Sequence, residues 1–279
     1  MIKVGLEGAP PITAAGLRFI LASIVIFSIL IYKGIKLPRD RKFLYLSLYL
    51  GFFQMAIPYA LVYWAEQHIT SGLTSILFST MPFTVAILAR IFLGDPLTIP
   101  KVAGITIGTI GVVVIFYDGL SVGSTEALLG IAATLLSAVF ASVSSIVIKR
   151  FSRQYNPLAS IFVPMVIGGI VLTAVGRVAE ANRTITFDLT TVFSIVYLAV
   201  LGSVAAFGLY YWIIKHMDVT ALSYQTFIIP ILACVIGWIF LRETVTLNVA
   251  FGGGMIVIGI ALATLSRSRE KRIANVGVQ

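Results

Sequence analysis

The stretch YLGFFQMAIPYALVYWAEQH at residues 49–68 recurs in altered form as YLAVLGSVAAFGLYYWIIKH at residues 197–216. The match extends without gaps from residues 49–117 to residues 197–265, and 15 of the 69 pairs are identical. Shared apolar composition does not explain matched Trp, His and Pro, so the chain contains an internal repeat. The identical pairs include Tyr63/Tyr211, Trp64/Trp212, His68/His216, Pro82/Pro230, Gly104/Gly252 and Gly111/Gly259.

The composition around this repeat places the chain in a membrane. Of the 279 residues, 59% are hydrophobic and 11% are charged, and the mean hydropathy is +1.03. Soluble domains carry about 25% charged residues, so a soluble globule of this length could not bury so much apolar surface. The net charge of +9 does not indicate nucleic-acid binding, because the basic residues lie between apolar runs instead of forming one patch.

Nine apolar runs follow one another along the chain, each long enough, or nearly so, to cross a bilayer as a helix. A membrane β-barrel would alternate polar and apolar residues over segments of about ten residues, and these runs do not. We therefore expect an all-α polytopic membrane protein. The runs cover residues 13–32, 43–65, 73–93, 101–117, 128–148, 158–176, 192–214, 219–241 and 248–265.

The distribution of Lys and Arg predicts the orientation. When the loop at residues 32–42 is placed inside, fifteen basic residues fall inside and four fall outside. Cytoplasmic loops of membrane proteins carry such an excess. We expect a multi-pass protein of the plasma (inner) membrane with a cytoplasmic C-terminus.

The repeat predicts how these helices are organised. The second copy has five spans and the first shows four, and an odd repeat unit forces the two copies into opposite orientations. We expect a ten-helix inverted repeat whose first helix is missing before Met1; the alternative is a native start with nine helices. The expected segments are a first repeat at 1–117, an outer linker at 118–127, a second repeat at 128–266 and a basic cytoplasmic tail at 267–279.

Several motifs resemble the EamA-type transporters of the drug/metabolite transporter superfamily over essentially the whole chain. They are Ala15-Gly16-Leu17-Arg18-Phe19, the mid-span Pro82 and Pro230, Phe92-Leu93-Gly94-Asp95 and Phe240-Leu241-Arg242-Glu243. The first copy continues as Asp95-Pro96-Leu97, a mild departure from the family's usual acid followed by a Leu-like residue. The resemblance implies a secondary transporter, an exporter of small metabolites such as amino acids, that works by alternating access around a central cavity.

Other functions stay open at this stage. Another carrier of the superfamily, such as a drug-efflux protein, fits the same motifs. An integral-membrane enzyme acting on lipid or small substrates would need acids, His or Cys clustered at one membrane face. The sequence shows no such cluster, no metal site and no nucleotide-binding loop, so we expect no cofactor. The expected partners are a small-molecule substrate and the lipid bilayer.

Polar and aromatic residues deep in the spans are the candidate site, because polar groups in hydrocarbon need a partner or a cavity. The substrate-cavity candidates are Gln54, Tyr59, Tyr63, Ser79, Thr80, Ser137, Tyr211, Tyr224, Gln225 and Thr226. Pro82 and Pro230 are candidate hinges, or plain packing kinks. Trp64 with His68 and Trp212 with His216 are candidate gates, or parts of aromatic belts.

Two further features have more than one interpretation. Arg18 lies well inside a span and could snorkel to the interface, pair with an acid such as Glu66 or attract an anionic group. The glycines at 104, 108 and 111 and at 252–254 and 259 form small-residue faces. Helix packing within the bundle is the favoured use of these faces, and a homodimer interface is the alternative.

Overall fold

The computed structural model describes residues 9–115, 117, 124–182, 188–232 and 247–276, with side chains as far as residue 263. Every regular element in these ranges is helical. Most of the expected linker, the side chains of the basic tail and the Phe240–Glu243 motif lie outside the described residues.

Six described helices are long and apolar enough to cross a membrane. Three shorter apolar helices accompany them, so each of the nine apolar runs is at least partly helical where it is described. The prediction of an all-helical polytopic membrane protein is confirmed. The long helices are Pro11–Tyr32, Arg41–Ala65, Ser71–Leu93, Thr125–Phe151, Pro157–Ala179 and Leu189–His216, and the shorter ones are Ile99–Ile115, Val219–Leu232 and Leu247–Ala263.

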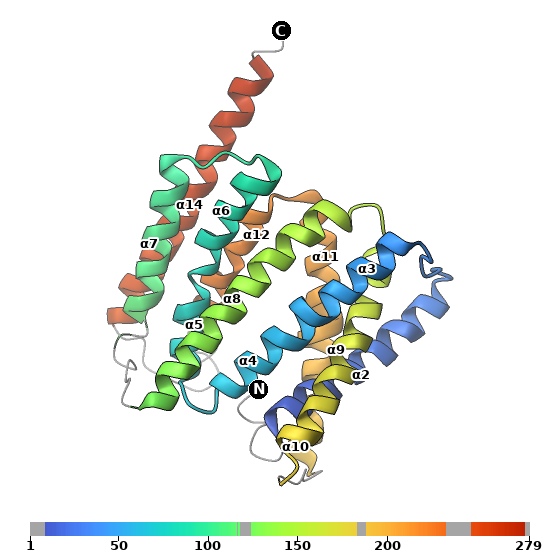
Figure 1. The fold of residues 1–279 in the computed structure, drawn as a ribbon. Helices are drawn as coiled ribbons and strands as arrows, with labels where there is room; N and C mark the ends of the chain where they lie inside the picture. Colours follow the sequence, from blue (N-terminus) through green and yellow to red (C-terminus); the bar gives the residue numbers. More distant parts are fainter. Residues whose placement is uncertain (1–8, 116, 118–123, 183–187, 233–246, 277–279) are drawn as a thin grey trace. The chain divides into compact units, whose positions relative to one another are not determined.

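The chain forms two compact units, and each draws on both sequence repeats. Unit 1 comprises residues 1–68 and 126–217, and unit 2 comprises residues 69–125 and 218–279. The helices of unit 1 are α2 (Pro11–Tyr32), α3 (Arg41–Leu50), η1 (Gly51–Ala56), α4 (Ile57–Ala65), α8 (Thr125–Phe151), α9 (Pro157–Ala179), α10 (Leu189–Ala199), η3 (Val200–Ala205) and α11 (Ala206–His216). Those of unit 2 are α5 (Ser71–Phe78), α6 (Met81–Leu93), α7 (Ile99–Ile115), α12 (Val219–Ser223) and α14 (Leu247–Val276) (Figure 1).

Several helix ends are fixed by side chains next to them in the sequence. Asp40 accepts a hydrogen bond from the backbone N–H of Phe43 at the start of α3, and Asp188 accepts one from Thr191 at the start of α10. These caps satisfy N–H groups that have no partner inside the helix. At the other end of α6, Gly94 adopts a left-handed conformation with φ 74°, which ends the helix cheaply because glycine has no Cβ.

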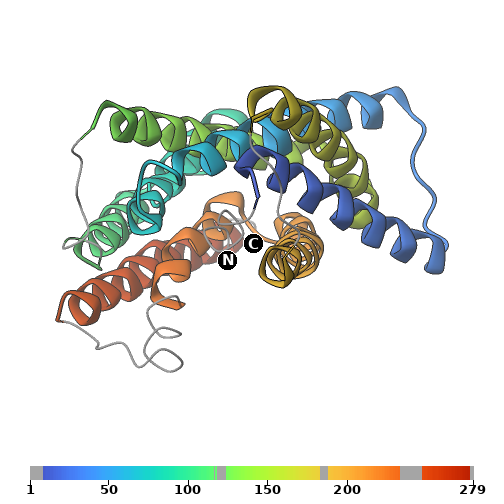
Figure 2. The same ribbon diagram turned by 90° about the horizontal axis from the view of Figure 1, so that it is seen from below.

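In unit 1, α2 lies along α9 (Figures 1 and 2). Two π-helical segments interrupt neighbouring helices: η1 joins α3 to α4 and packs on α9, while η3 joins α10 to α11 and packs on α2. The carboxylate of Glu180, just after α9, accepts hydrogen bonds from the backbone N–H groups of Ile12 and Thr13. It therefore caps the start of α2 from 167 or more residues away in sequence.

In unit 2, α7 lies beside α14 (Figures 1 and 2), and glycines of the two helices meet where they pack. A Cβ on Gly111 would lie 2.6 Å from the carbonyl oxygen of Gly252, and a Cβ on Gly259 would lie 2.5 Å from that of Gly104. The pairing shows that the two helices run antiparallel. Packing inside the protein, the use that the sequence favours for these glycines, is therefore confirmed for these four.

Candidate functional site

The two π-helical segments lie at almost the same place in the two repeats. The repeat offset carries residues 51–56 onto residues 199–204, and η3 spans residues 200–205. Pro58 follows η1 closely and has no N–H to donate, which disrupts regular hydrogen bonding just before it. Isolated π-helical turns occur frequently at functional sites. The two π-helical segments are therefore candidate functional elements of the repeat.

Gln54, in η1, is bonded to a tyrosine of the other repeat. The hydroxyl of Tyr211 donates a hydrogen bond of 2.5 Å to Oε1 of Gln54, and both side chains are buried. Serines of α8 bind the neighbouring backbone: Ser144 donates to the carbonyl of Phe53 over 3.2 Å, and Ser137 donates to that of Pro58 over 3.1 Å. The structure therefore brings Gln54, Tyr211 and Ser137 to one irregular stretch of unit 1.

Arg18 contacts the second π-helical segment. Its Nε donates to Oγ of Ser203 over 2.8 Å, one terminal nitrogen donates to the carbonyl of Gly202 over 2.8 Å, and the other donates to the hydroxyl of Tyr63 over 3.2 Å. The guanidinium carbon also lies 5.3 Å from the centre of the Tyr59 ring, within the range of a cation–π contact. Arg18 is only 4% exposed, so it does not snorkel to the surface of this unit.

The two clusters are counterparts in the sequence repeat. Tyr63 aligns with Tyr211, and Gln54 aligns with Gly202. Tyr211 is bonded directly to Gln54. At the counterpart position Gly202 has no side chain, and the guanidinium of Arg18 lies between it and Tyr63. The neutral amide of Gln54 contacts the tyrosine in one cluster, whereas the charged guanidinium of Arg18 contacts the tyrosine in the other.

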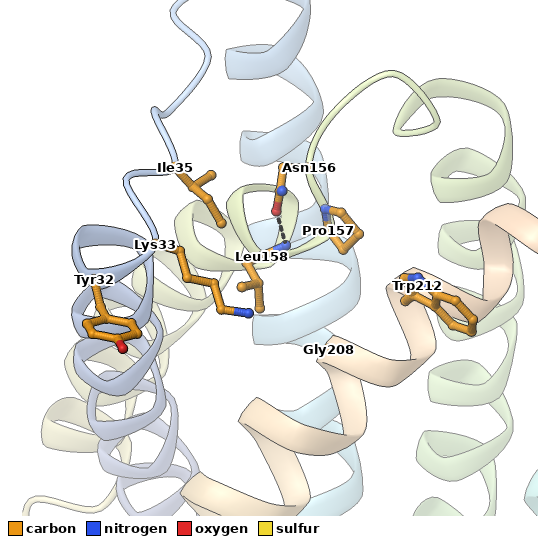
Figure 3. Close-up of a pocket in the computed structure, with 8 residues that line it drawn as sticks. All are labelled: Tyr32, Lys33, Ile35, Asn156, Pro157, Leu158, Gly208 and Trp212. Atoms are coloured by element: carbon orange, nitrogen blue, oxygen red, sulfur yellow. Dashed lines mark hydrogen bonds between the residues drawn. The ribbon is translucent and has the colours of Figure 1, made fainter.

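A pocket of about 740 Å³ opens at the end of unit 1 that carries the 33–40 loop. In Figure 3, Lys33 extends from the end of α2 toward α11, whose Gly208 and Trp212 form the opposite wall. Asn156 caps the start of α9 at the rim, accepting a hydrogen bond of 2.9 Å from the N–H of Leu158. An open pocket with a cationic group on one wall and an aromatic group on the other can admit a small amphipathic molecule.

Hydrogen bonds of charged and polar side chains connect the loops at this end of unit 1. The hydroxyl of Tyr155 donates to Asp40 over 2.5 Å, and Lys215 donates to the carbonyl of Tyr155. The bond from Tyr155 lowers the pKa of Asp40, whereas burial, followed by this bond, raises the pKa of Tyr155. Lys149, on α8, donates to the carbonyls of Ile214 and Met217 at the end of α11, each over 2.7 Å.

The candidate gates form the expected pairs. The rings of Trp64 and His68 lie 4.6 Å apart at the end of α4, and those of Trp212 and His216 lie 4.7 Å apart at the end of α11. Nδ1 of His216 is also 2.8 Å from the carbonyl oxygen of Trp212. Of the four residues, Trp212 lines the pocket.

The candidates in unit 2 are mostly engaged with their own helices. Ser79, Thr80 and Thr226 each donate to a carbonyl three residues earlier. Ser79 and Thr80 lie at the break between α5 and α6, and Pro82 is in the first turn of α6. Pro230 and Tyr224 are buried, and the Tyr224 ring stacks on that of Phe227. Gln225 is exposed. The structure does not gather this set around one polar centre within unit 2.

The described residues contain no group of three His, Cys, Asp or Glu that could hold a metal ion. Bilayer-length helices, an internal repeat and polar side chains buried at irregular helix segments instead define a polytopic membrane protein of the transporter type. The chain belongs to the EamA-like transporter family, whose model matches residues 1–117 and 128–265. It is accordingly a multi-pass membrane transporter.

Similar proteins agree with this class. The transporter YoaV of Bacillus subtilis is 25% identical over 97% of this chain and 92% of its own length. A transporter of Archaeoglobus fulgidus is 30% identical over 95% and 93%. The inner membrane transporter YedA of Escherichia coli is 27% identical over 96% and 86%. These relatives are named as transporters, not as enzymes. One solved crystal structure has the same fold, with a TM-score of 0.81 at 20% identity over 96% of this chain and 92% of that one.

Proposed function

We propose that this protein exports small metabolites such as amino acids across the plasma membrane by alternating access, with its C-terminus in the cytoplasm. The observation that carries the proposal is the pair of buried clusters, one at each π-helical segment. Each joins a tyrosine of one repeat to the irregular backbone or side chain of the other. Two equivalent contacts of this kind are what a carrier needs to open first on one side and then on the other.

The proposed motion uses the irregular segments as hinges. Backbone in η1 and η3 already departs from regular α-helical bonding, so bending there costs less than in an uninterrupted helix. Pro82 and Pro230 serve as hinges in unit 2. Release of the bond between Tyr63 and Arg18, or of that between Tyr211 and Gln54, lets the corresponding helix move. The predicted cavity residues of unit 1 then line the substrate path, and the two Trp–His pairs gate its ends. These cavity residues are Gln54, Tyr59, Tyr63, Ser137 and Tyr211.

The pocket beside Lys33 is the proposed cytoplasmic entrance. Gly208 is on its wall, and a Cβ added there would meet no atom within 4 Å. A side chain at residue 208 therefore begins in open space, and we expect Gly208→Phe to fill the entrance and to slow transport about tenfold or more. Gly254→Phe is the matched control, because a Cβ on Gly254 also meets no atom within 4 Å and this glycine lies in unit 2.

The direct test is transport by purified protein in proteoliposomes. A panel of labelled amino acids and other small metabolites is offered with and without a pH gradient. Saturable flux of at least one compound, slowed by Gly208→Phe and unchanged by Gly254→Phe, supports the proposal. Folded protein that carries no compound of the panel contradicts it.

A further inference from the structure

Arg18 is a buried cation held by neutral groups. The structure gives it the hydroxyls of Ser203 and Tyr63 and the carbonyl of Gly202 as hydrogen-bond partners. The rings of Phe19 and Tyr59 lie 5.4 Å and 5.3 Å from its guanidinium carbon. None of these five groups carries a negative charge. Taking a charge out of water is costly unless an opposite charge compensates it, and charged groups inside membrane helices mark substrate or ion sites by default.

The counterpart cluster, as far as the structure describes it, contains no charged group. In the counterpart cluster, the amide of Gln54 reaches Tyr211 and holds the same kind of contact without any ionic group. The repeat therefore contains a neutral solution to the same packing problem. The two clusters thus differ by one positive charge, which a ligand of opposite charge could match.

We propose that Arg18 binds the carboxylate of the transported molecule, an inference that rests on the proposed transport function and narrows its substrate class. A guanidinium has five N–H donors in a planar fork that matches a carboxylate. The three bonds above occupy three of these donors in the closed cluster, and a carboxylate can take their place when the cluster opens. A single positive charge matches a monoanion, and the surrounding Phe19, Tyr59 and Phe207 rings match an apolar or aromatic side chain.

The site is closed in this structure. Hydrogen bonds to groups of two different helices occupy the guanidinium: the Tyr63 hydroxyl on α4, and the Ser203 hydroxyl and Gly202 carbonyl in η3. Movement of either helix at its π-helical segment exposes the guanidinium. Access to the carboxylate site is thereby coupled to the motion that transport requires.

The test compares acids with matched compounds that lack the carboxylate. L-Phenylalanine, L-leucine and L-glutamine are each paired with their amide and their decarboxylated amine. Binding is measured by thermal stabilisation of the detergent-solubilised protein, and transport by competition in proteoliposomes. We expect the wild type to prefer at least one acid over its amide and amine by about tenfold or more, the worth of one charge-assisted hydrogen-bonded pair.

Three variants separate recognition from folding. Arg18→Gln should remove the preference, and Arg18→Lys should keep part of it because the charge remains. The double variant Arg18→Met with Gly202→Gln copies the neutral arrangement of the other cluster, so it should fold and still bind without discriminating acids from amides. A Cβ on Gly202 would meet the Arg18 side chain first, at 3.3 Å, and this variant shortens that side chain. Arg90→Gln, an exposed arginine on α6, is the charge-matched control.

The outcomes distinguish this inference from the proposed function. Wild-type protein that transports amides and amines as well as the acids overturns the role of Arg18 and leaves transport standing. Wild-type protein that carries nothing, yet is stabilised by an acid through Arg18, supports the carboxylate site and contradicts the transport proposal. Binding of no acid by the wild type, or full acid preference in the double variant, overturns the inference.

Discussion

Tyr211 donates a hydrogen bond of 2.5 Å to Gln54 from a position 157 residues away in the sequence. Tyr211 is fully buried and Gln54 is 8% exposed, so water does not readily replace either partner. The bond joins α11 of the second repeat to the π-helical η1 of the first. It is therefore both a stabilising contact and, in the proposed mechanism, one of the two contacts that must break.

Removal of the Tyr211 hydroxyl should destabilise the protein. In Tyr211→Phe the carbonyl oxygen of Gln54 stays buried without this donor, and an unsatisfied buried polar group costs about 1–3 kcal/mol. Thermal unfolding in detergent should show a lowered Tm, whereas Tyr45→Phe should not, because Tyr45 is 68% exposed.

The double variant tests whether the loss belongs to this pair. Replacement of both polar groups, in Gln54→Leu with Tyr211→Phe, should cost less than the sum of the two single changes because no orphaned group remains. Strict additivity would show that the bond contributes nothing to stability.

The packing of α7 against α14 gives a second prediction. Gly252→Ala adds a Cβ 2.5 Å from the carbonyl oxygen of Gly111, which is too close, so the helices must separate. We expect a loss of about 1–3 kcal/mol, typical of overpacking. Gly253→Ala is the neighbouring control. Its Cβ would meet no atom within 4 Å, and alanine favours helix over glycine by about 1 kcal/mol. Equal destabilisation by the two changes would be incompatible with this packing.

The sequence predicts the helices well and their irregularities poorly. Apolar runs long enough to cross a membrane indicate where the helices lie, because few other structures can span a bilayer. The repeat also aligns Gly104 with Gly252 and Gly111 with Gly259. In the structure, Gly104 contacts Gly259 and Gly111 contacts Gly252. Helix positions and glycine contacts can thus be predicted from one sequence, because the sequence signals for them are local or repeated.

The polar contacts are not local. Arg18 finds its partners in η3 184 and 185 residues later, and no pattern near Arg18 indicates them. Carbonyl groups in and beside the π-helical segments accept bonds from such distant donors, and sequence periodicity does not reveal these bonds. Gln225 is polar and lies within an apolar run, yet its side chain is exposed while those of its neighbours Tyr224 and Thr226 are buried. Polarity identifies candidates, but three-dimensional packing decides which of them meet.

A third prediction concerns Glu180, which caps α2 from the end of α9. Its carboxylate accepts bonds of 2.9 Å and 3.0 Å from the N–H groups of Ile12 and Thr13 and one of 2.8 Å from the Thr13 hydroxyl. Glu180→Ala should cost about 1–2 kcal/mol, as loss of an N-terminal cap does. Thr13→Val removes a single bond and should cost less. An unchanged Tm for Glu180→Ala would show that the cap adds no stability.

The bond between Tyr155 and Asp40 predicts a specific pH dependence. The bond lowers the pKa of Asp40. The ionised Asp40 carboxylate therefore contributes stability above the unfolded-state pKa of Asp, about 3.9, and this contribution is lost as the pH falls through the lower pKa of the folded state. The pKa of Tyr155 is raised, so its contribution is present below about pH 10 and is lost as the pH rises through the higher folded value.

Two substitutions isolate these contributions in the Tm of detergent-solubilised protein followed from acid to alkaline pH. Asp40→Asn should flatten the acid limb of the curve, and Tyr155→Phe should weaken that limb and flatten the alkaline one. The bond from Thr191 lowers the pKa of Asp188 in the same direction, so Asp188→Asn should alter the acid limb without affecting the alkaline one. If Tyr155→Phe left both limbs as in the wild type, the bond would not carry the pH dependence.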